Sequence, residues 1–116
     1  MSARELKALL DGLKPSKALI LCHHNADPDA VCSAIALGEL LRTLCPGIEV
    51  TCYAAQGVSK VSKGILERFG FSFSREARPA DADILFMVDT NNVEQLEELK
   101  EEVKVRAREV PLVVID

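Results

Sequence analysis

Hydrophobic positions along the chain follow two patterns, namely short runs that are apolar throughout and longer stretches with helical spacing. The run ALILC, ending at Cys22, and the run ILFMV, ending at Val88, are apolar at every successive position, which is typical of strands buried on both faces. The helical stretches repeat apolar residues at intervals of three and four, as the leucines between Leu6 and Leu13 do. We therefore predict strands at residues 18–23, 48–55, 83–92 and 111–116, and helices at 3–13, 28–44, 59–70 and 93–110.

The predicted strands and helices alternate, and short connections join them. Pro46 and Gly47 follow one helix and Gly70 another, as expected where helices end. Alternation of this kind favours a parallel sheet with right-handed crossovers and helices on both faces. We predict an α/β fold, a Rossmann-like three-layer α/β/α arrangement around a mainly parallel sheet of about four strands. Ligands of such sheets bind beyond the carboxyl ends of the strands.

Composition narrows the class of protein. The 116 residues are 48% hydrophobic and 28% charged, which suits one compact domain. The net charge of −4 and the scarcity of aromatic residues do not indicate a nucleic-acid surface, although an acidic protein can still carry a locally basic site. No apolar run approaches the ~18 residues of a membrane span, and the N-terminal residues lack the apolar core of a signal peptide. We predict a soluble cytoplasmic protein without a membrane partner.

The four cysteines, Cys22, Cys32, Cys45 and Cys52, match no CxxC zinc or redox motif. Each lies in an apolar context, so we predict buried free thiols. Disulfide bonds would require an oxidising compartment, and nothing else in the sequence indicates one.

Acidic residues follow three of the predicted strands. Asp27 and Asp29 come after the first strand, Asp89 after the third, and Asp116 after the last. A parallel sheet would bring these carboxylates to one edge, where their mutual repulsion is relieved mainly by cations between them. Oxygen ligands together with an imidazole such as that of His23 suit Mn²⁺ or Mg²⁺. Two such ions ~3.5–4 Å apart are a common means of activating water for attack on phosphorus.

Structural roles could also explain these residues. Asp27 precedes a proline and is a favourable helix N-cap, and Asn91 followed by Glu94 resembles a capping box. Asp116 could be a simple strand-end acid. A histidine at a strand end often belongs to the core, but His23 lies four residues before Asp27, which favours a ligand.

The segment HHNADPDAVCSAIAL resembles the first motif of the DHH phosphoesterase family. In that alignment His23 is the motif histidine, His24 its variable position, and Asp27 and Asp29 its two aspartates. The segment VDTNNVEQL resembles the second motif, with Asp89 as the metal-bridging aspartate. The final LVVID resembles the approach to the third motif, D-H-H, and its last residue, Asp116, is the motif aspartate.

This resemblance implies hydrolysis of a phosphodiester, phosphomonoester or phosphoanhydride with two Mn²⁺ or Mg²⁺ ions in the complete protein. Similar proteins include RecJ-type exonucleases, oligonucleotide hydrolases and manganese pyrophosphatases. The pyrophosphatases have V-D-H-N in the second motif, whereas this chain has Thr90 at the third position, which favours a nucleotide or short single-stranded nucleic acid as substrate. The resemblance implies metal ligation by His23, Asp27, Asp29 and Asp89, with Asn25, His24 and Asp116 orienting those ligands.

The chain ends one residue before the two histidines of the third motif, and the fourth motif and the C-terminal substrate domain of the family are missing. We therefore expect residues 1–116 to be the N-terminal part of a catalytic domain that is inactive alone. Sheet edges exposed by truncation would favour a homodimer. Three alternatives stay open: a non-catalytic nucleotide-binding or regulatory module, an inorganic pyrophosphatase-like hydrolase, and a plain α/β domain whose acids cap helices.

Overall fold

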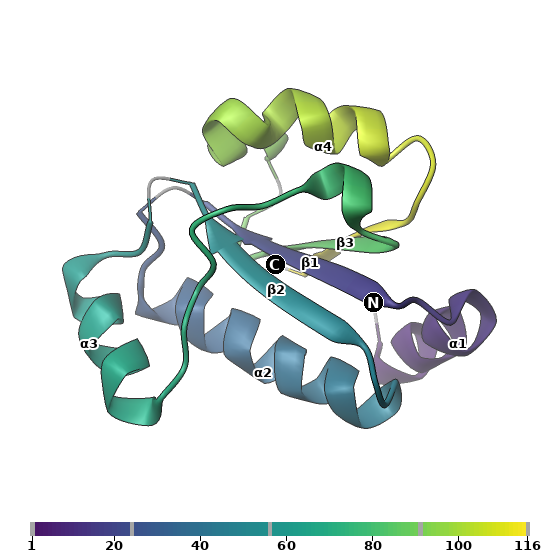
Figure 1. The fold of residues 1–116 in the computed structure, drawn as a ribbon, viewed down its shortest axis with the longest axis horizontal. Coiled ribbons are helices and arrows are strands. Elements are labelled where there is room, and N and C mark those ends of the chain that lie inside the picture. Colours follow the sequence, from purple (N-terminus) through teal and green to yellow (C-terminus); the bar gives the residue numbers. More distant parts are fainter. Residues whose placement is uncertain (1, 24, 56, 91, 116) are drawn as a thin grey trace.

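The strands form one sheet in which every neighbouring pair is parallel, as seen in a computed structural model (Figure 1). The structure describes residues 2–23, 25–55, 57–90 and 92–115. Within these ranges the strand order is β2-β1-β3-β4, so that β1 and β3 lie in the centre. The strands are β1 (Lys17–Cys22), β2 (Glu49–Ala54), β3 (Ile84–Val88) and β4 (Leu112–Ile115).

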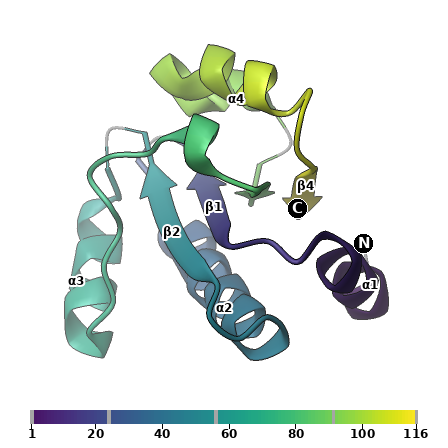
Figure 2. The ribbon, with the colours of Figure 1, turned by 45° about the vertical axis from the view of Figure 1, so that its right-hand side comes forward.

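Helices cover both faces of this sheet, which confirms the predicted three-layer α/β/α arrangement. One face packs against α1, α2 and α3, and the other against η2 and α4 (Figure 2). The helices are α1 (Ala3–Leu13), α2 (Pro28–Leu44), α3 (Lys60–Phe69) and α4 (Lys100–Arg106), and two 3₁₀ segments are η1 (Pro79–Asp81) and η2 (Val93–Leu99).

The central strands bury side chains on both faces, as their continuous apolar runs predicted. Along β1, Ile20 and Cys22 belong to the core beneath α2, whereas Leu19 and Leu21 belong to the core beneath α4. Successive side chains of a strand point to opposite faces, so each needs its own hydrophobic layer. Phe86 in the middle of β3 is fully buried in the core beneath α2, to which β1 and β4 also contribute side chains.

One predicted helix is divided in the structure. Instead of a single helix over residues 93–110, the chain forms η2 and then α4, and η2 itself is kinked at Glu97, whose backbone is non-helical with a φ of 54°. Apolar residues recur three apart from Val93 to Leu99 and four apart from Leu99 to Val103, so 3₁₀-type spacing precedes α-type spacing. The predicted apolar side is confirmed, because Leu99 and Val103 are buried against the sheet.

The prediction of four buried thiols is wrong for Cys32. All four cysteines are free, but Cys32 is exposed, because it lies on the outer side of α2. Cys22 is buried, and Cys45 and Cys52 are partly buried. No helix within the described ranges has both the length and the apolar character needed to cross a membrane.

Candidate metal centre

At the centre of the sheet, between β1 and β3, the crossover connections change from one face of the sheet to the other. The crossover from β1 to β2 runs through α2 on one face, and that from β3 to β4 runs through α4 on the other (Figures 1 and 2). Because β1 and β3 are neighbours, the segments leaving their carboxyl ends diverge and leave room for a ligand. His23 directly follows β1 and Asp89 directly follows β3. The pairing of Leu21 with Met87, continued by two residues, places them side by side.

The loop between β1 and α2 is held by the segment that follows β2. The backbone N–H of Asn25 donates to the carbonyl of Ala55 at 3.2 Å, and that of Ala26 donates to Gly57 at 3.3 Å. The Ala26 carbonyl in turn accepts from the Ser59 N–H at 2.8 Å and from the Ser62 hydroxyl at 3.0 Å. These contacts fix the loop on which His23, Asn25 and Asp27 lie.

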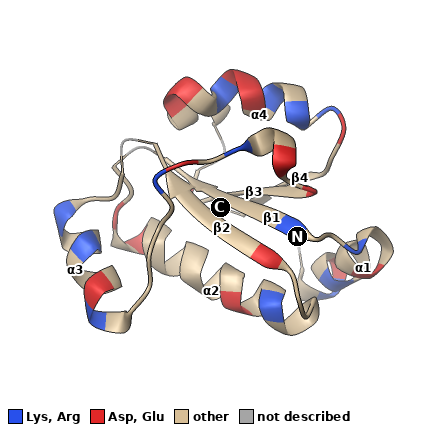
Figure 3. Ribbon diagram, in the orientation of Figure 1, with Lys and Arg blue, Asp and Glu red and all other residues tan. Residues whose placement is uncertain are grey.

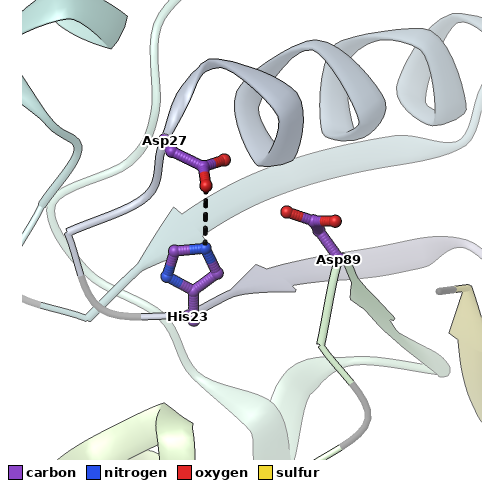
Figure 4. Close-up of side chains that lie close together, drawn as sticks. All are labelled: His23, Asp27 and Asp89. Atoms are coloured by element: carbon purple, nitrogen blue, oxygen red, sulfur yellow. Dashed lines mark ion pairs between the residues drawn. The ribbon is translucent and has the colours of Figure 1, made fainter.

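Asp27 has two roles, one for each of its carboxylate oxygens. Its Oδ1 accepts a hydrogen bond from the Ala30 N–H at 2.9 Å, which confirms the predicted N-cap of α2. Its Oδ2 lies 3.9 Å from Nε2 of His23 (Figure 4). A carboxylate at the start of a helix is also stabilised by the helix dipole. Capping therefore orients Asp27 and leaves its second oxygen available to a ligand.

Asp89 has a left-handed backbone conformation, with a φ of 58°. Its N–H donates to the Ile115 carbonyl at 2.9 Å, which extends the pairing of β3 and β4 by one residue before the chain turns. Its carboxylate lies on the same side as the imidazole of His23 and the carboxylate of Asp27 (Figure 4). For residues other than glycine this conformation costs roughly 1–3 kcal/mol, and such residues cluster at functional sites.

The side chains of His23, Asp27 and Asp89 form a group that could hold a metal ion. One ligand atom from each lies within 4.8 Å of the other two. Ligand atoms of a Mg²⁺ ion lie at ~2.0–2.1 Å from it, so any two of them are at most about 4.2 Å apart, which is close to the spacing of this group. Two carboxylates and an imidazole are the donors that these hard cations accept. Within the described ranges, Asp27 pairs with His23 alone and Asp89 with no lysine or arginine, so cationic side chains do not neutralise the group.

Cys22 lies immediately before this group but is buried in the core beneath α2. Burial raises the pKa of its thiol to about 12, and the negative charges of Cys52, Asp89 and Asp27 add to the effect. Its Sγ donates to the Ala30 carbonyl at 3.7 Å. Cys22 is not among the side chains brought together, so the group has oxygen and nitrogen donors.

Thr90 anchors the segment that follows Asp89, a role that the sequence did not reveal. Its side chain is buried, and its Oγ1 donates to Oε1 of Gln95 and accepts from the Asn92 N–H at 3.3 Å. Asn92 is the N-cap of η2, because its Oδ1 accepts from the Glu94 N–H at 3.0 Å. No local sequence pattern pairs a threonine with a glutamine five residues later. The capping box predicted at Asn91 lies outside the described residues.

The remaining predicted site residues lie apart from the group or outside the described ranges. Asp29 is exposed in the first turn of α2 and is not among the three residues brought together. Asn25 is exposed beside the group, with a φ of 52° that asparagine tolerates better than most residues. The predictions for His24 and Asp116 concern residues that the structure does not describe.

Comparison with known proteins defines the class. Residues 17–116 match the DHH family, N-terminal domain, so the chain belongs to the DHH family, whose members are generally metal-dependent phosphoesterases. It is 43% identical over 97 residues to an uncharacterised protein of Methanocaldococcus jannaschii, a match that covers 80% of this chain and 29% of that protein. Its fold is similar to the crystal structure of an exopolyphosphatase-related protein from Bacteroides fragilis, with a TM-score of 0.75, 17% identity, and coverage of 98% of this chain and 35% of the other. The chain thus spans about a third of the length of these two proteins.

Proposed function

We propose that this chain provides the first half of the site of a divalent-metal-dependent phosphoesterase that hydrolyses a phosphodiester or phosphomonoester bond in a nucleotide or short nucleic acid. The observation that carries the proposal is the convergence of His23, Asp27 and Asp89 beyond the carboxyl ends of β1 and β3. The DHH family membership supports the same reaction class.

The side chains of the group have distinct tasks in this proposal. Mn²⁺ or Mg²⁺ bound there would polarise the phosphoryl oxygens and lower the pKa of a coordinated water. His23 and Asp27 would hold one ion, and the helix cap fixes the direction of the Asp27 carboxylate. Asp89 would be shared with a second ion, to which Asp29 in the first turn of α2 would contribute a further oxygen. The hydrogen bond from the Asp89 N–H to the Ile115 carbonyl holds the backbone that carries the Asp89 carboxylate.

Three further residues support these ligands in the proposal. Asn25, His24 and Asp116 would orient the ligand side chains, a task whose loss typically changes metal affinity by ~10–100-fold. Residues 1–116 form the N-terminal part of the catalytic domain, and a segment beyond them completes the site and selects the substrate. The chain covers only 29% and 35% of the lengths of the two similar proteins, which supports this division.

The test is an Asp89→Asn substitution in the full-length protein. Asparagine keeps the shape of the side chain and removes the charge, so we expect hydrolysis of a short oligonucleotide with Mn²⁺ to fall at least ~100-fold. Asp11→Asn is a matched control, because among the described residues Asp11 forms an ion pair with Lys7 alone, on the exposed side of α1. Circular dichroism of both variants should match the wild type. Hydrolysis by Asp89→Asn at the wild-type rate would contradict the mechanism.

The same assay separates the alternatives. Inorganic pyrophosphate and short polyphosphate are included because the structurally similar Bacteroides protein is described as exopolyphosphatase-related. A rate on these compounds far above that on nucleotides would favour a phosphoanhydride hydrolase. Nucleotide binding without hydrolysis of any substrate would favour a regulatory module of the same fold.

A further inference from the structure

A second recess lies at the free edge of β2, away from the ligand side chains. It has a volume of about 660 Å³, within the ~300–1,000 Å³ range of ligand sites. Its walls are one side of α3, the carboxyl half of β2 and the segment 71–75, which crosses β2 on its way to β3 (Figure 1). That segment is tied to the strand by a hydrogen bond from the Ser74 N–H to the Cys52 carbonyl at 2.8 Å. We call this recess the β2-edge cleft.

The β2-edge cleft gathers most of the aromatic side chains of the chain. The sequence contains one tyrosine and four phenylalanines, and Tyr53, Phe71 and Phe73 line the cleft. Phe71 is 40% exposed although it is large and apolar. Tyr53 is partly buried and packs with the core beneath α4, so it lines the cleft from the other face of β2, whereas Phe73 packs with the core beneath α2. An aromatic face that is open to solvent, as that of Phe71 is, can serve as a platform on which a nucleobase stacks.

Charged side chains surround these rings. Lys63 on α3 and Arg75 on the crossing segment line the cleft, and neither forms an ion pair within the described ranges. Figure 3 shows blue cationic bands on both α3 and the crossing segment. Glu67 and Glu98 also line the cleft, and their carboxylates are hydrogen-bond acceptors for amino groups. Unpaired cations beside aromatic rings suit a ligand that carries both phosphate and a base.

The cleft adjoins the candidate metal centre through a shared backbone segment. Gly57 and Val58 line the cleft, and they pair with Ala26, which directly precedes Asp27. Paired backbones are ~4.8 Å apart and consecutive Cα atoms 3.8 Å apart, so the Cα of Asp27 lies at most about 9 Å from the paired backbone of this wall. A substrate with its phosphate between His23 and Asp89 would therefore reach the cleft with its neighbouring base.

We infer that the β2-edge cleft binds a nucleobase of the substrate, by stacking on Phe71, while Lys63 and Arg75 face its phosphate backbone. The placement of the scissile phosphate in this inference rests on the proposed function. Because every base has a stacking face, the cleft favours substrates that carry bases over base-free phosphates and discriminates little among the bases.

The test measures steady-state kinetics of the full-length protein on a dinucleotide and on its abasic analogue. Stacking contributes about 1–3 kcal/mol per base, so Phe71→Ala should raise KM for the dinucleotide about 5- to 150-fold, with kcat changed less than about 3-fold. Phe71→Trp keeps a stacking face and should restore KM. The abasic analogue should respond to none of these changes. Phe69→Ala is the matched control, because Phe69 is 64% exposed and does not line the cleft.

Direct binding of a fluorescent dinucleotide separates failure of this inference from failure of the proposed function. If the protein hydrolyses the dinucleotide while Phe71→Ala behaves as Phe69→Ala does, the inference is wrong and the proposed function stands. If no phosphate compound is hydrolysed but Phe71→Ala weakens dinucleotide binding and Phe69→Ala does not, the proposed reaction is wrong and base binding in the cleft is supported.

Discussion

Asp27 offers a test that separates a structural from a ligand role in one side chain. Its Oδ1 caps α2 at Ala30, and its Oδ2 faces His23 in the candidate metal centre. Asparagine at this position keeps a capping oxygen but loses the charge, whereas alanine loses both. The two substitutions should therefore have different effects on the free energy of unfolding and on its response to Mn²⁺.

The expected magnitudes follow from the two contacts. Loss of an N-cap costs about 1 kcal/mol, so Asp27→Ala should lower the free energy of unfolding by about that amount without metal. Asp27→Asn should lie within about 0.5 kcal/mol of the wild type, since asparagine caps helices as well as aspartate does and no longer repels Asp89. A free Mn²⁺ concentration of about 100 times Kd stabilises a folded protein by ~2.7 kcal/mol. Both variants should lose most of this increment.

The assay is urea unfolding of the full-length protein, with and without Mn²⁺, for the wild type and each variant. Ser2→Ala is the control, because Ser2 caps α1 through a hydrogen bond from the Glu5 N–H at 3.1 Å, far from the metal group. It should lose about 1 kcal/mol in both conditions and keep the whole Mn²⁺ increment. Retention of the full increment by Asp27→Asn would refute ligation by Asp27. Equal stability of the alanine and asparagine variants without metal would refute the capping contribution.

Two further predictions concern the residues next to the ligands. Burial raises the pKa of Cys22 from its ordinary 9.0 to about 12, so the folded state keeps the thiol proton at pH 10 whereas the unfolded chain loses it. This thiol should therefore lower the free energy of unfolding by about 1.4 kcal/mol between pH 8 and pH 10, and Cys22→Ala should show a pH dependence smaller by that amount in unfolding titrations. An identical pH dependence of both proteins would contradict the argument. Thr90→Val removes the hydroxyl that holds Gln95 and the Asn92 N–H, so we expect a loss of about 1–3 kcal/mol in urea unfolding. As a control, Thr43→Val removes an exposed hydrogen bond to the Glu39 carbonyl and should cost less than about 0.5 kcal/mol. Equal losses of unfolding free energy in the two variants would contradict a larger contribution from the Thr90 hydroxyl.

Local signals explain why most elements could be predicted from the sequence. The helix predicted at residues 28–44 matches α2, since Asp27 and proline mark its start and Pro46 and Gly47 follow its end. The apolar runs of β1 and β3 required burial on both faces, which already implied central strands of a layered fold. The division of the helix near Glu97 could not be predicted, because the spacing of its apolar residues is compatible with both a 3₁₀ helix and an α-helix. Only packing against the sheet fixes which of these residues are buried.

The candidate site shows the limits of a local reading. A histidine and carboxylates after apolar strands predicted a group of ligands, and the structure brings His23, Asp27 and Asp89 together. It does not bring Asp29 into that group, because Asp29 lies in the first turn of α2, one residue past the proline that follows the cap. Closeness in sequence to the other motif residues does not show where a helical side chain points, because successive residues of a helix point to different sides.

The sequence by itself determined the order of the strands along the chain and the approximate position of the elements other than the divided helix, which acids follow the strands, and that hard divalent cations suit them. Only the tertiary structure decided that β3 lies beside β1, although β2 intervenes in the chain, and this neighbourhood places Asp89 opposite His23. The same packing assembled the β2-edge cleft from Tyr53 and the distant Phe71. Strand order and crossover direction depend on how apolar faces bury one another across the whole domain, and no local stretch of sequence encodes that arrangement.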